Sequence, residues 1–233
     1  MLIFWDIDGT LMSCGGDGTE AMNRAFFELY GIPDAFLGAG VGGAQDFAVI
    51  RRIAAECGIE KFDPAALETA YIANLARILD RNEHKRVMPG VVDLLEYARG
   101  AGLANLLLTS NLRAGAETKL RSVGLWAYFD ESFCGGFGDA PGEKWDAAAA
   151  VISAAETRFG RPFRPSDVVV IGDSVYDIRS AKRIGARHIA VATGWTSAET
   201  LSAETPEYLF DDLADTPRVI AAIGKNLLKR YER

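Results

Sequence analysis

Short apolar runs alternate with longer segments of helical periodicity over most of the chain. The runs at residues 2–5, 106–108 and 168–171 are unbroken, which is typical of strands buried on both faces of a parallel sheet. Strands are predicted at 2–5, 104–108, 132–134, 168–171, 187–192 and 208–210, and helices at 91–100, 114–123, 144–159, 178–184 and 198–201. This alternation predicts an α/β fold with a doubly wound, mainly parallel sheet.

Residues 18–85 depart from this pattern. Three amphipathic segments at 20–30, 46–57 and 64–80 have helical spacing, and few strand-like runs lie among them. We therefore expect two domains: an α/β core made of 1–17 and 86–233, and an inserted all-helical domain made of 18–85. The segments 12–18 and 84–89 are the predicted hinges between them.

Composition narrows the functional class. The net charge of −7 over 233 residues leaves no basic surplus to neutralise nucleic-acid phosphates, so we expect no nucleic-acid partner. No apolar stretch approaches the ~20 residues of a membrane span, so we expect no membrane partner. The apolar strand at the start lacks the basic segment of a secretory signal, and the three cysteines have no zinc spacing. Together these features predict a cytoplasmic protein. We expect it to be a monomer or a homodimer.

Carboxylates follow two of the predicted strands. Asp6 and Asp8 end the first strand, and Asp173 and Asp177 follow the strand at 168–171. The carboxyl ends of parallel strands form the ligand-binding edge of an open α/β sheet. Carboxylates gathered there need a cation or a shared proton, so the pattern predicts a divalent-cation site.

These residues resemble the motifs of the haloacid dehalogenase superfamily. The segment from Asp6 to Thr10 matches the family's DxDGT motif, and the segment from Gly172 to Asp177 matches GDxxxD. Thr109 matches the hydroxyl that closes an apolar strand in the family. The resemblance implies a Rossmann-like core with a helical cap domain inserted after the first strand, and it is nearest to the phosphoglycolate phosphatase-like branch.

The resemblance also implies a mechanism. Asp6 would be the nucleophile that forms an aspartyl-phosphate, and Asp8 the general acid and base. Mg²⁺ would be held by Asp6, the Asp8 carbonyl and Asp173. Asp177 would bind the metal directly, hold a metal-bound water or only cap the following helix, and the role through water is favoured. Thr109 would hydrogen-bond a phosphoryl oxygen. An acid at position 8 favours phosphoryl transfer over dehalogenation, because a halide needs no proton to leave.

Other predicted site residues depend on weaker signals. Lys144 is the best match to the family's lysine that neutralises the nucleophile and the phosphoryl group. Lys119 is the alternative, but its place in the middle of a helix favours a surface lysine. Ser110 and Asn111, next to Thr109, are predicted to bind substrate. Gly43 and Asp46 in the inserted domain are expected to contact the substrate from above.

The predicted function is therefore Mg²⁺-dependent hydrolysis of a small phosphorylated metabolite. A phosphomutase of the same superfamily is an alternative, because it carries the same motifs. A non-catalytic regulator that binds Mg²⁺ or phosphate is a third possibility, which the complete set of acids disfavours.

Overall fold

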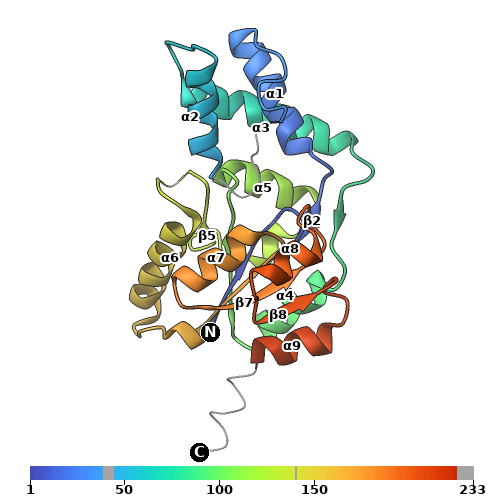
Figure 1. Ribbon diagram of the computed structural model, residues 1–233, viewed down its shortest axis with the longest axis vertical. Coiled ribbons are helices and arrows are strands. Elements are labelled where there is room, and N and C mark those ends of the chain that lie inside the picture. The colour runs from blue at the N-terminus through green and yellow to red at the C-terminus, as the bar shows by residue number, and fades with distance from the viewer. Residues whose placement is uncertain (39–44, 140, 225–233) are drawn as a thin grey trace, which may run out of the picture.

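A parallel sheet of six strands forms the centre of the protein (Figure 1). The computed structural model describes residues 1–38, 45–139 and 141–224. The strand order is β5-β4-β1-β6-β7-β8, and Leu2 of the central strand pairs with Ala104 on one side and Val168 on the other. The strands are β1 (Leu2–Trp5), β4 (Ala104–Leu108), β5 (Gly135–Gly136), β6 (Val168–Gly172), β7 (Arg187–Val191) and β8 (Tyr208–Phe210).

Helices cover both faces of this sheet. Leu2 and Phe4 of β1 belong to one buried cluster, which includes α6 (Lys144–Phe159) and α7 (Val175–Arg183). Ile3 and Trp5 face the opposite way and pack with the remaining core helices. These are α4 (Val91–Gly100), α5 (Arg113–Ser122) and α9 (Thr216–Gly224); α8 (Ala198–Ala203) packs beside α7 and β7. The predicted doubly wound α/β fold is confirmed.

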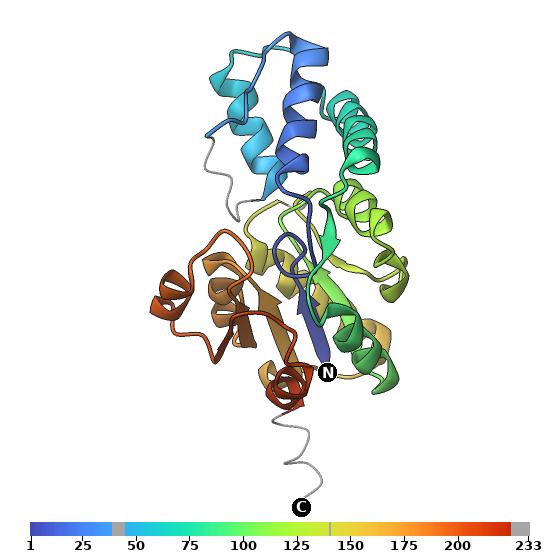
Figure 2. The ribbon, with the colours of Figure 1, turned by 90° about the vertical axis from the view of Figure 1, so that its right-hand side faces the viewer.

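Three helices stand above the carboxyl edge of the sheet (Figures 1 and 2). They are α1 (Asp17–Tyr30), α2 (Asp46–Glu56) and α3 (Pro64–Arg81). Asp63 caps α3 by accepting hydrogen bonds from the N–H groups of Ala65 and Ala66, as the Asp-Pro pair at its start favours. The boundaries of the predicted domains, 1–17 with 86–233 and 18–85, stay predictions.

The two predicted hinges lie side by side. Within them β2 (Met12–Ser13) pairs antiparallel with β3 (Arg86–Val87). Asn82 ties the same crossing together, because its Nδ2 donates to the Cys14 carbonyl at 3.0 Å and to Asp17 Oδ2 at 2.7 Å. The chain therefore enters and leaves the helical insert through one narrow connection.

Some short elements were predicted wrongly or missed, because tertiary contacts determine their positions. The strand predicted at 132–134 lies instead at Gly135–Gly136, because Asp130 accepts hydrogen bonds from Ser132 and holds that segment in a turn. The β2–β3 ribbon, α9 and the short 3-10 helices at Trp126–Tyr128 and Pro165–Asp167 were not predicted. Among the described helices, none combines the length and apolar character needed to cross a membrane.

Candidate active site

Functional loops meet at the carboxyl ends of the central strands. Asp6 follows β1, Thr109 follows β4 and Asp173 follows β6, so adjacent strands bring the three side chains to one edge. A cavity of about 480 Å³ opens at this edge, beneath the helical insert. Gly9, with φ at 87°, turns the chain here, and a Cβ on it would lie 2.6 Å from Asp173 Oδ2.

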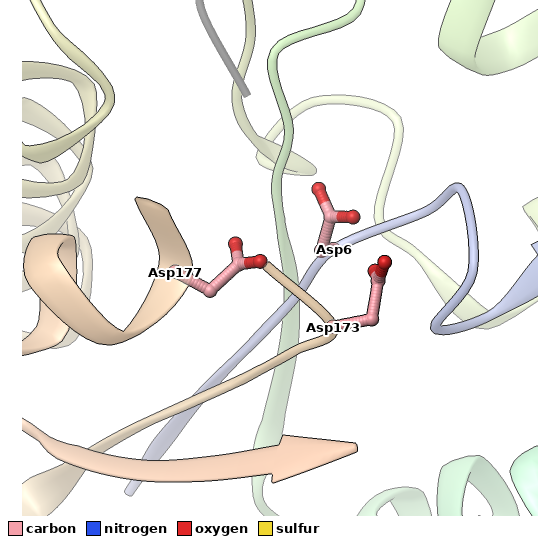
Figure 3. Close-up of side chains that lie close together, drawn as sticks. All are labelled: Asp6, Asp173 and Asp177. Carbon is pink, nitrogen blue, oxygen red and sulfur yellow. The ribbon is translucent and has the colours of Figure 1, made fainter. Parts of the chain in front are cut away.

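Three carboxylates gather at this edge: Asp6 and Asp173 line the cavity, and Asp177 is buried beside them. Asp6, Asp173 and Asp177 each offer an oxygen, and these oxygens lie within 4.8 Å of one another (Figure 3). In the close-up, Asp6 comes from the end of β1, and the other two come from the segment after β6. Such a set of hard oxygen donors suits a divalent cation such as Mg²⁺.

Lys144 compensates two of these charges. Its Nζ donates to Asp6 Oδ1 at 2.8 Å and to Asp177 Oδ1 at 2.6 Å. Burial works against the Lys144 ammonium, but the two carboxylates outweigh it and raise its pKa. Burial raises the pKa of Asp6 to about 6, Lys144 opposes this rise, and Asp177 adds to it. Lys144 therefore stays charged beside the carboxylate expected to act as nucleophile.

Among the described residues, no lysine or arginine contacts Asp173 in this way. Thr10 Oγ1 donates to its Oδ1 at 2.9 Å, and Asp6 and Asp177 are its charged neighbours of like sign. Burial, reinforced by these two carboxylates, raises the pKa of Asp173 well above its ordinary value. Gly194 leaves the space around Asp173 open, because a Cβ there would clash with the carboxylate. The cluster thus has an uncompensated carboxylate and fits a bound cation.

Both oxygens of Asp177 are already engaged. Oδ1 accepts from Lys144, and Oδ2 accepts from the Ser174 N–H at 3.0 Å and from Ser174 Oγ at 2.5 Å. Ser174 and Asp177 together form the capping box at the start of α7. This arrangement favours an indirect role for Asp177 at a metal, through a water.

A second charged group surrounds Asp8. Its Oδ2 accepts from Asn111 Nδ2 at 2.8 Å and from Lys119 Nζ at 2.6 Å, while Lys119 also donates to Asn111 Oδ1 at 2.7 Å. Burial would raise the pKa of Asp8, but Lys119 and these hydrogen bonds outweigh it and lower the pKa. Asp8 still keeps 38% of its side chain exposed in the cavity.

Residues of the helical insert line the side of the cavity that faces Asp8. Asp46 and Tyr71 both line the cavity, and the Tyr71 ring reaches close to Gly115 of α5, where a Cβ would lie 2.8 Å from the Tyr71 hydroxyl. The Asp46 N–H donates to the Ser110 carbonyl at 3.0 Å, which joins α2 to the loop after β4. Burial raises the pKa of Asp46 to about 7, against the opposing charge of Lys119.

Comparison with known proteins identifies the family. Residues 1–185 match the model of the haloacid dehalogenase-like hydrolases, which is most of the chain. The chain belongs to this family. The resemblance found in its motifs is thereby confirmed, and so is the prediction of an enzyme.

Several curated relatives of this hydrolase are named phosphoglycolate phosphatase. A phosphoglycolate phosphatase of Pseudomonas putida is 27% identical over 215 residues, which covers 91% of this chain and 76% of the relative. Phosphoglycolate phosphatase 1 of Pseudomonas aeruginosa is 26% identical over 217 residues, covering 92% and 77%. These relatives support the predicted phosphatase class.

Solved structures share the fold of the hydrolase. A hydrolase from Pseudomonas syringae has a TM-score of 0.68 at 21% identity and covers 95% of this chain and 98% of its own. CbbY from Rhodobacter sphaeroides, solved in complex with phosphate, has a TM-score of 0.69 at 23% identity and covers 92% and 95%. At these identities the likeness shows the fold alone.

One interpretation of the hydrolase sequence was wrong. Lys119 was expected on the surface, yet its residue is only 4% exposed and its ammonium lies on Asp8. The available signal was its helical position, since Ala116 and Leu120 are buried beside it on α5. Tyr71 was also missed, because it belongs to an apolar helix face that reads as ordinary core.

The remaining predicted residues lie in distinct places. Thr109 lines the cavity, and its Oγ1 accepts from Asn111 Nδ2 at 2.8 Å. Asn111 lines the cavity, and its side chain bridges Thr109, Asp8 and Lys119. Its contact with substrate stays a prediction. Ser110 lines the cavity, and its carbonyl accepts from Asp46. Gly43 lies outside the described residues.

Proposed function

We propose that this hydrolase cleaves small phosphomonoesters with the help of Mg²⁺, through an aspartyl-phosphate on Asp6. The observation that carries the proposal is the pairing of Asp6 with Lys144 at a strand end, 2.8 Å apart and next to a second acid, Asp8, held by its own lysine. A charged lysine beside a carboxylate suits attack on an anionic phosphoryl group, because it reduces repulsion between the two.

The reaction divides into two displacements at phosphorus. In the first, an Asp6 oxygen bonds to phosphorus, the bond to the leaving oxygen breaks, and Asp8 gives that oxygen a proton. In the second, water attacks the aspartyl-phosphate, Asp8 takes the proton of the water, and the bond between phosphorus and Asp6 breaks. Since its pKa is lowered, Asp8 is a carboxylate in the free enzyme, and the proton that it passes to the leaving oxygen comes to it from a substrate bound as its monoanion.

The metal and phosphoryl contacts follow from the same geometry. Mg²⁺ held by Asp6, Asp173 and the Asp8 carbonyl would neutralise phosphoryl charge, which is the chemistry it supplies in this family. Thr109 donates its hydroxyl proton to a phosphoryl oxygen, and Lys144 neutralises the charge that develops during transfer. Asp177 keeps Lys144 charged and in position.

The helical insert limits the size of the substrate. Cavity residues come both from the sheet edge and from the insert helices, so a bound ester is partly enclosed between them. A small phosphorylated metabolite fits about 480 Å³, and the curated relatives are named for such a compound. A cytoplasmic location and a monomeric or homodimeric state complete the proposal.

The test measures inorganic phosphate released from a panel of phosphate esters. Asp6→Asn should abolish release, because an amide is isosteric with the carboxylate but a poor nucleophile; circular dichroism and the melting temperature confirm folding. EDTA should stop wild-type release, and Mg²⁺ should restore it. Near wild-type activity of folded Asp6→Asn protein contradicts the mechanism. Interconversion of sugar phosphates faster than phosphate release would identify a mutase instead.

A further inference from the structure

The charges that line the cavity restrict the substrate beyond its phosphate. We infer that the leaving group of the substrate carries no negative charge, being a hydroxyl- or amine-bearing alcohol, and that Asp46 disfavours esters with a carboxylate. This inference rests on the proposed phosphatase function and names the class of substrate within it.

No cation is free for a second anionic group among the described cavity residues. Lys119 and Lys144 are the basic side chains that line the cavity there. Lys144 is held between Asp6 and Asp177, and Lys119 between Asp8 and Asn111. The sequence of residues 39–44, Ala-Gly-Val-Gly-Gly-Ala, contains no basic residue.

Asp46 adds negative charge on the leaving-group side. It lines the cavity from the start of α2, and the charges of Lys119 and Asp8 both act on it. Asp8 is the residue proposed to meet the leaving oxygen, so Asp46 lies on the side of the cavity to which the leaving group extends. The Asp46 carboxylate also accepts a hydrogen bond from the Leu112 N–H, which fixes it at the start of α5.

A leaving-group carboxylate would therefore meet Asp46 and Asp8 with no unpaired cation nearby. A buried anion without a partner is unfavourable, and a like charge beside it increases the penalty. A hydroxyl finds hydrogen-bonding partners instead in Ser13, Thr19 and Tyr71, which line the same cavity. An ammonium could pair directly with Asp46. The cavity thus differs from one built for the anion phosphoglycolate, after which the curated relatives are named.

Three esters of two carbons each isolate the effect of charge. They are 2-phosphoglycolate with a terminal carboxylate, 2-hydroxyethyl phosphate with a hydroxyl, and O-phosphoethanolamine with an ammonium. We measure kcat/KM by phosphate release at pH 8 with Mg²⁺, where Asp46 is ionised. The carboxylate ester should be poorer than the other two by roughly tenfold or more, as expected for one unpaired like charge.

Asp46→Asn tests the residue directly. The amide keeps the size of the side chain and an oxygen for Leu112, but removes the charge. It should raise kcat/KM for 2-phosphoglycolate relative to 2-hydroxyethyl phosphate by roughly tenfold. Asp46→Ser serves as a second charge-removing variant. Glu117→Gln is the matched control, because Glu117 pairs with Arg121 on α5 and does not line the cavity.

The outcomes separate this inference from the proposed function. If phosphate is released but 2-phosphoglycolate is the best of the three esters, the inference is wrong and the phosphatase function stands. The same holds if neither Asp46 variant changes the ratio of the esters while both remain folded. If none of the esters, nor p-nitrophenyl phosphate, releases phosphate, the proposed function fails and the inference fails with it.

Discussion

A lysine buried against Asp8 is the feature of the site with the clearest chemical consequence. Lys119 fixes one oxygen of Asp8 through a 2.6 Å ion pair, and Asn111 donates to the same oxygen. Asp8 can then present its other oxygen to the leaving group in a fixed direction. Lys119 thus acts through Asp8, as a positioning residue.

Replacement of Lys119 should affect poor leaving groups most. Lys119→Met should lower kcat/KM for an alkyl phosphate by roughly a hundredfold, because Asp8 loses the contact that orients it for proton transfer. The loss for p-nitrophenyl phosphate should be under about tenfold, since nitrophenolate leaves without a proton. Phosphate-release kinetics on both esters check this, with Lys182→Met as a control on the exposed side of α7. Equal losses on the two esters would contradict the role given to Lys119.

Titration of Asp46 predicts a pH-dependent selectivity. Burial raises its pKa to about 7, so the side chain is neutral below that pH and anionic above it. Discrimination against 2-phosphoglycolate, measured as the ratio of its kcat/KM to that of 2-hydroxyethyl phosphate, should therefore strengthen as pH rises through 7. The charged or titratable groups that face Asp46 are Lys119, Asp8, Asp139 and Tyr71. In Asp46→Asn the ratio should be flat; a wild-type ratio that does not change between pH 6 and 8 would exclude this titration.

Sequence alone could place the residues that directly follow strands. Asp6, Thr109 and Asp173 were predicted together because their positions depend on strand order and on the shared edge of a parallel sheet. The pairing of Lys119 with Asp8 could not be predicted, since it depends on how α5 packs against the loop after β1. The same is true of Tyr71, whose position depends on α3 lying close to Gly115.

The crossing between the insert and the sheet is held by the hydrogen bonds of Asn82. Besides its contacts with Cys14 and Asp17, Asn82 Oδ1 accepts from the N–H groups of His84 at 2.7 Å and Lys85 at 3.0 Å. One side chain therefore joins the end of α3 to both segments that enter and leave the insert.

Loss of this side chain should loosen the insert relative to the sheet. Asn82→Ala should lower the melting temperature by about 3 to 10 °C, from roughly 1 to 3 kcal/mol of lost buried hydrogen bonding. KM should rise severalfold, because the helices over the cavity are held less firmly. Calorimetry and steady-state kinetics measure both effects. Asn23→Ala is the control, since Asn23 accepts from the Phe36 N–H within the insert and should leave KM unchanged; equal KM values for the two variants would contradict the proposed coupling.

Elements with strong local signals were predicted closely. The predicted bounds of α4, α6 and β8 agree with the structure, because apolar periodicity and ending glycines mark the two helices and β8 is a short aromatic run. The two-residue strand β5 has only glycines and pairs with Leu107 and Leu108 through its backbone. Its position depends on that pairing, so no pattern of side chains could indicate it.

The complete fold should respond to Mg²⁺ through the acidic cluster. A cation that binds only the folded protein stabilises it by about 2.7 kcal/mol at one hundred times the dissociation constant, or about 5 to 10 °C for a chain of this size. Within the described parts of the chain no cation forms an ion pair with Asp173, so Asp173→Asn should reduce this shift strongly. Asp93→Asn, on the exposed side of α4, should keep it. Thermal unfolding of the wild type and both variants, with and without Mg²⁺, measures these shifts in melting temperature. An unchanged wild-type melting temperature would argue against a metal at this cluster.

The central position of β1 has a consequence for folding during biosynthesis. Its four buried residues are synthesised long before its neighbours, because β4 begins only at Ala104 and β6 only at Val168. At about 5 to 20 residues per second, an apolar strand emerges from the ribosome many seconds before either partner exists. The nascent chain must keep this segment from aggregating during that interval, while the helices of the insert are being made.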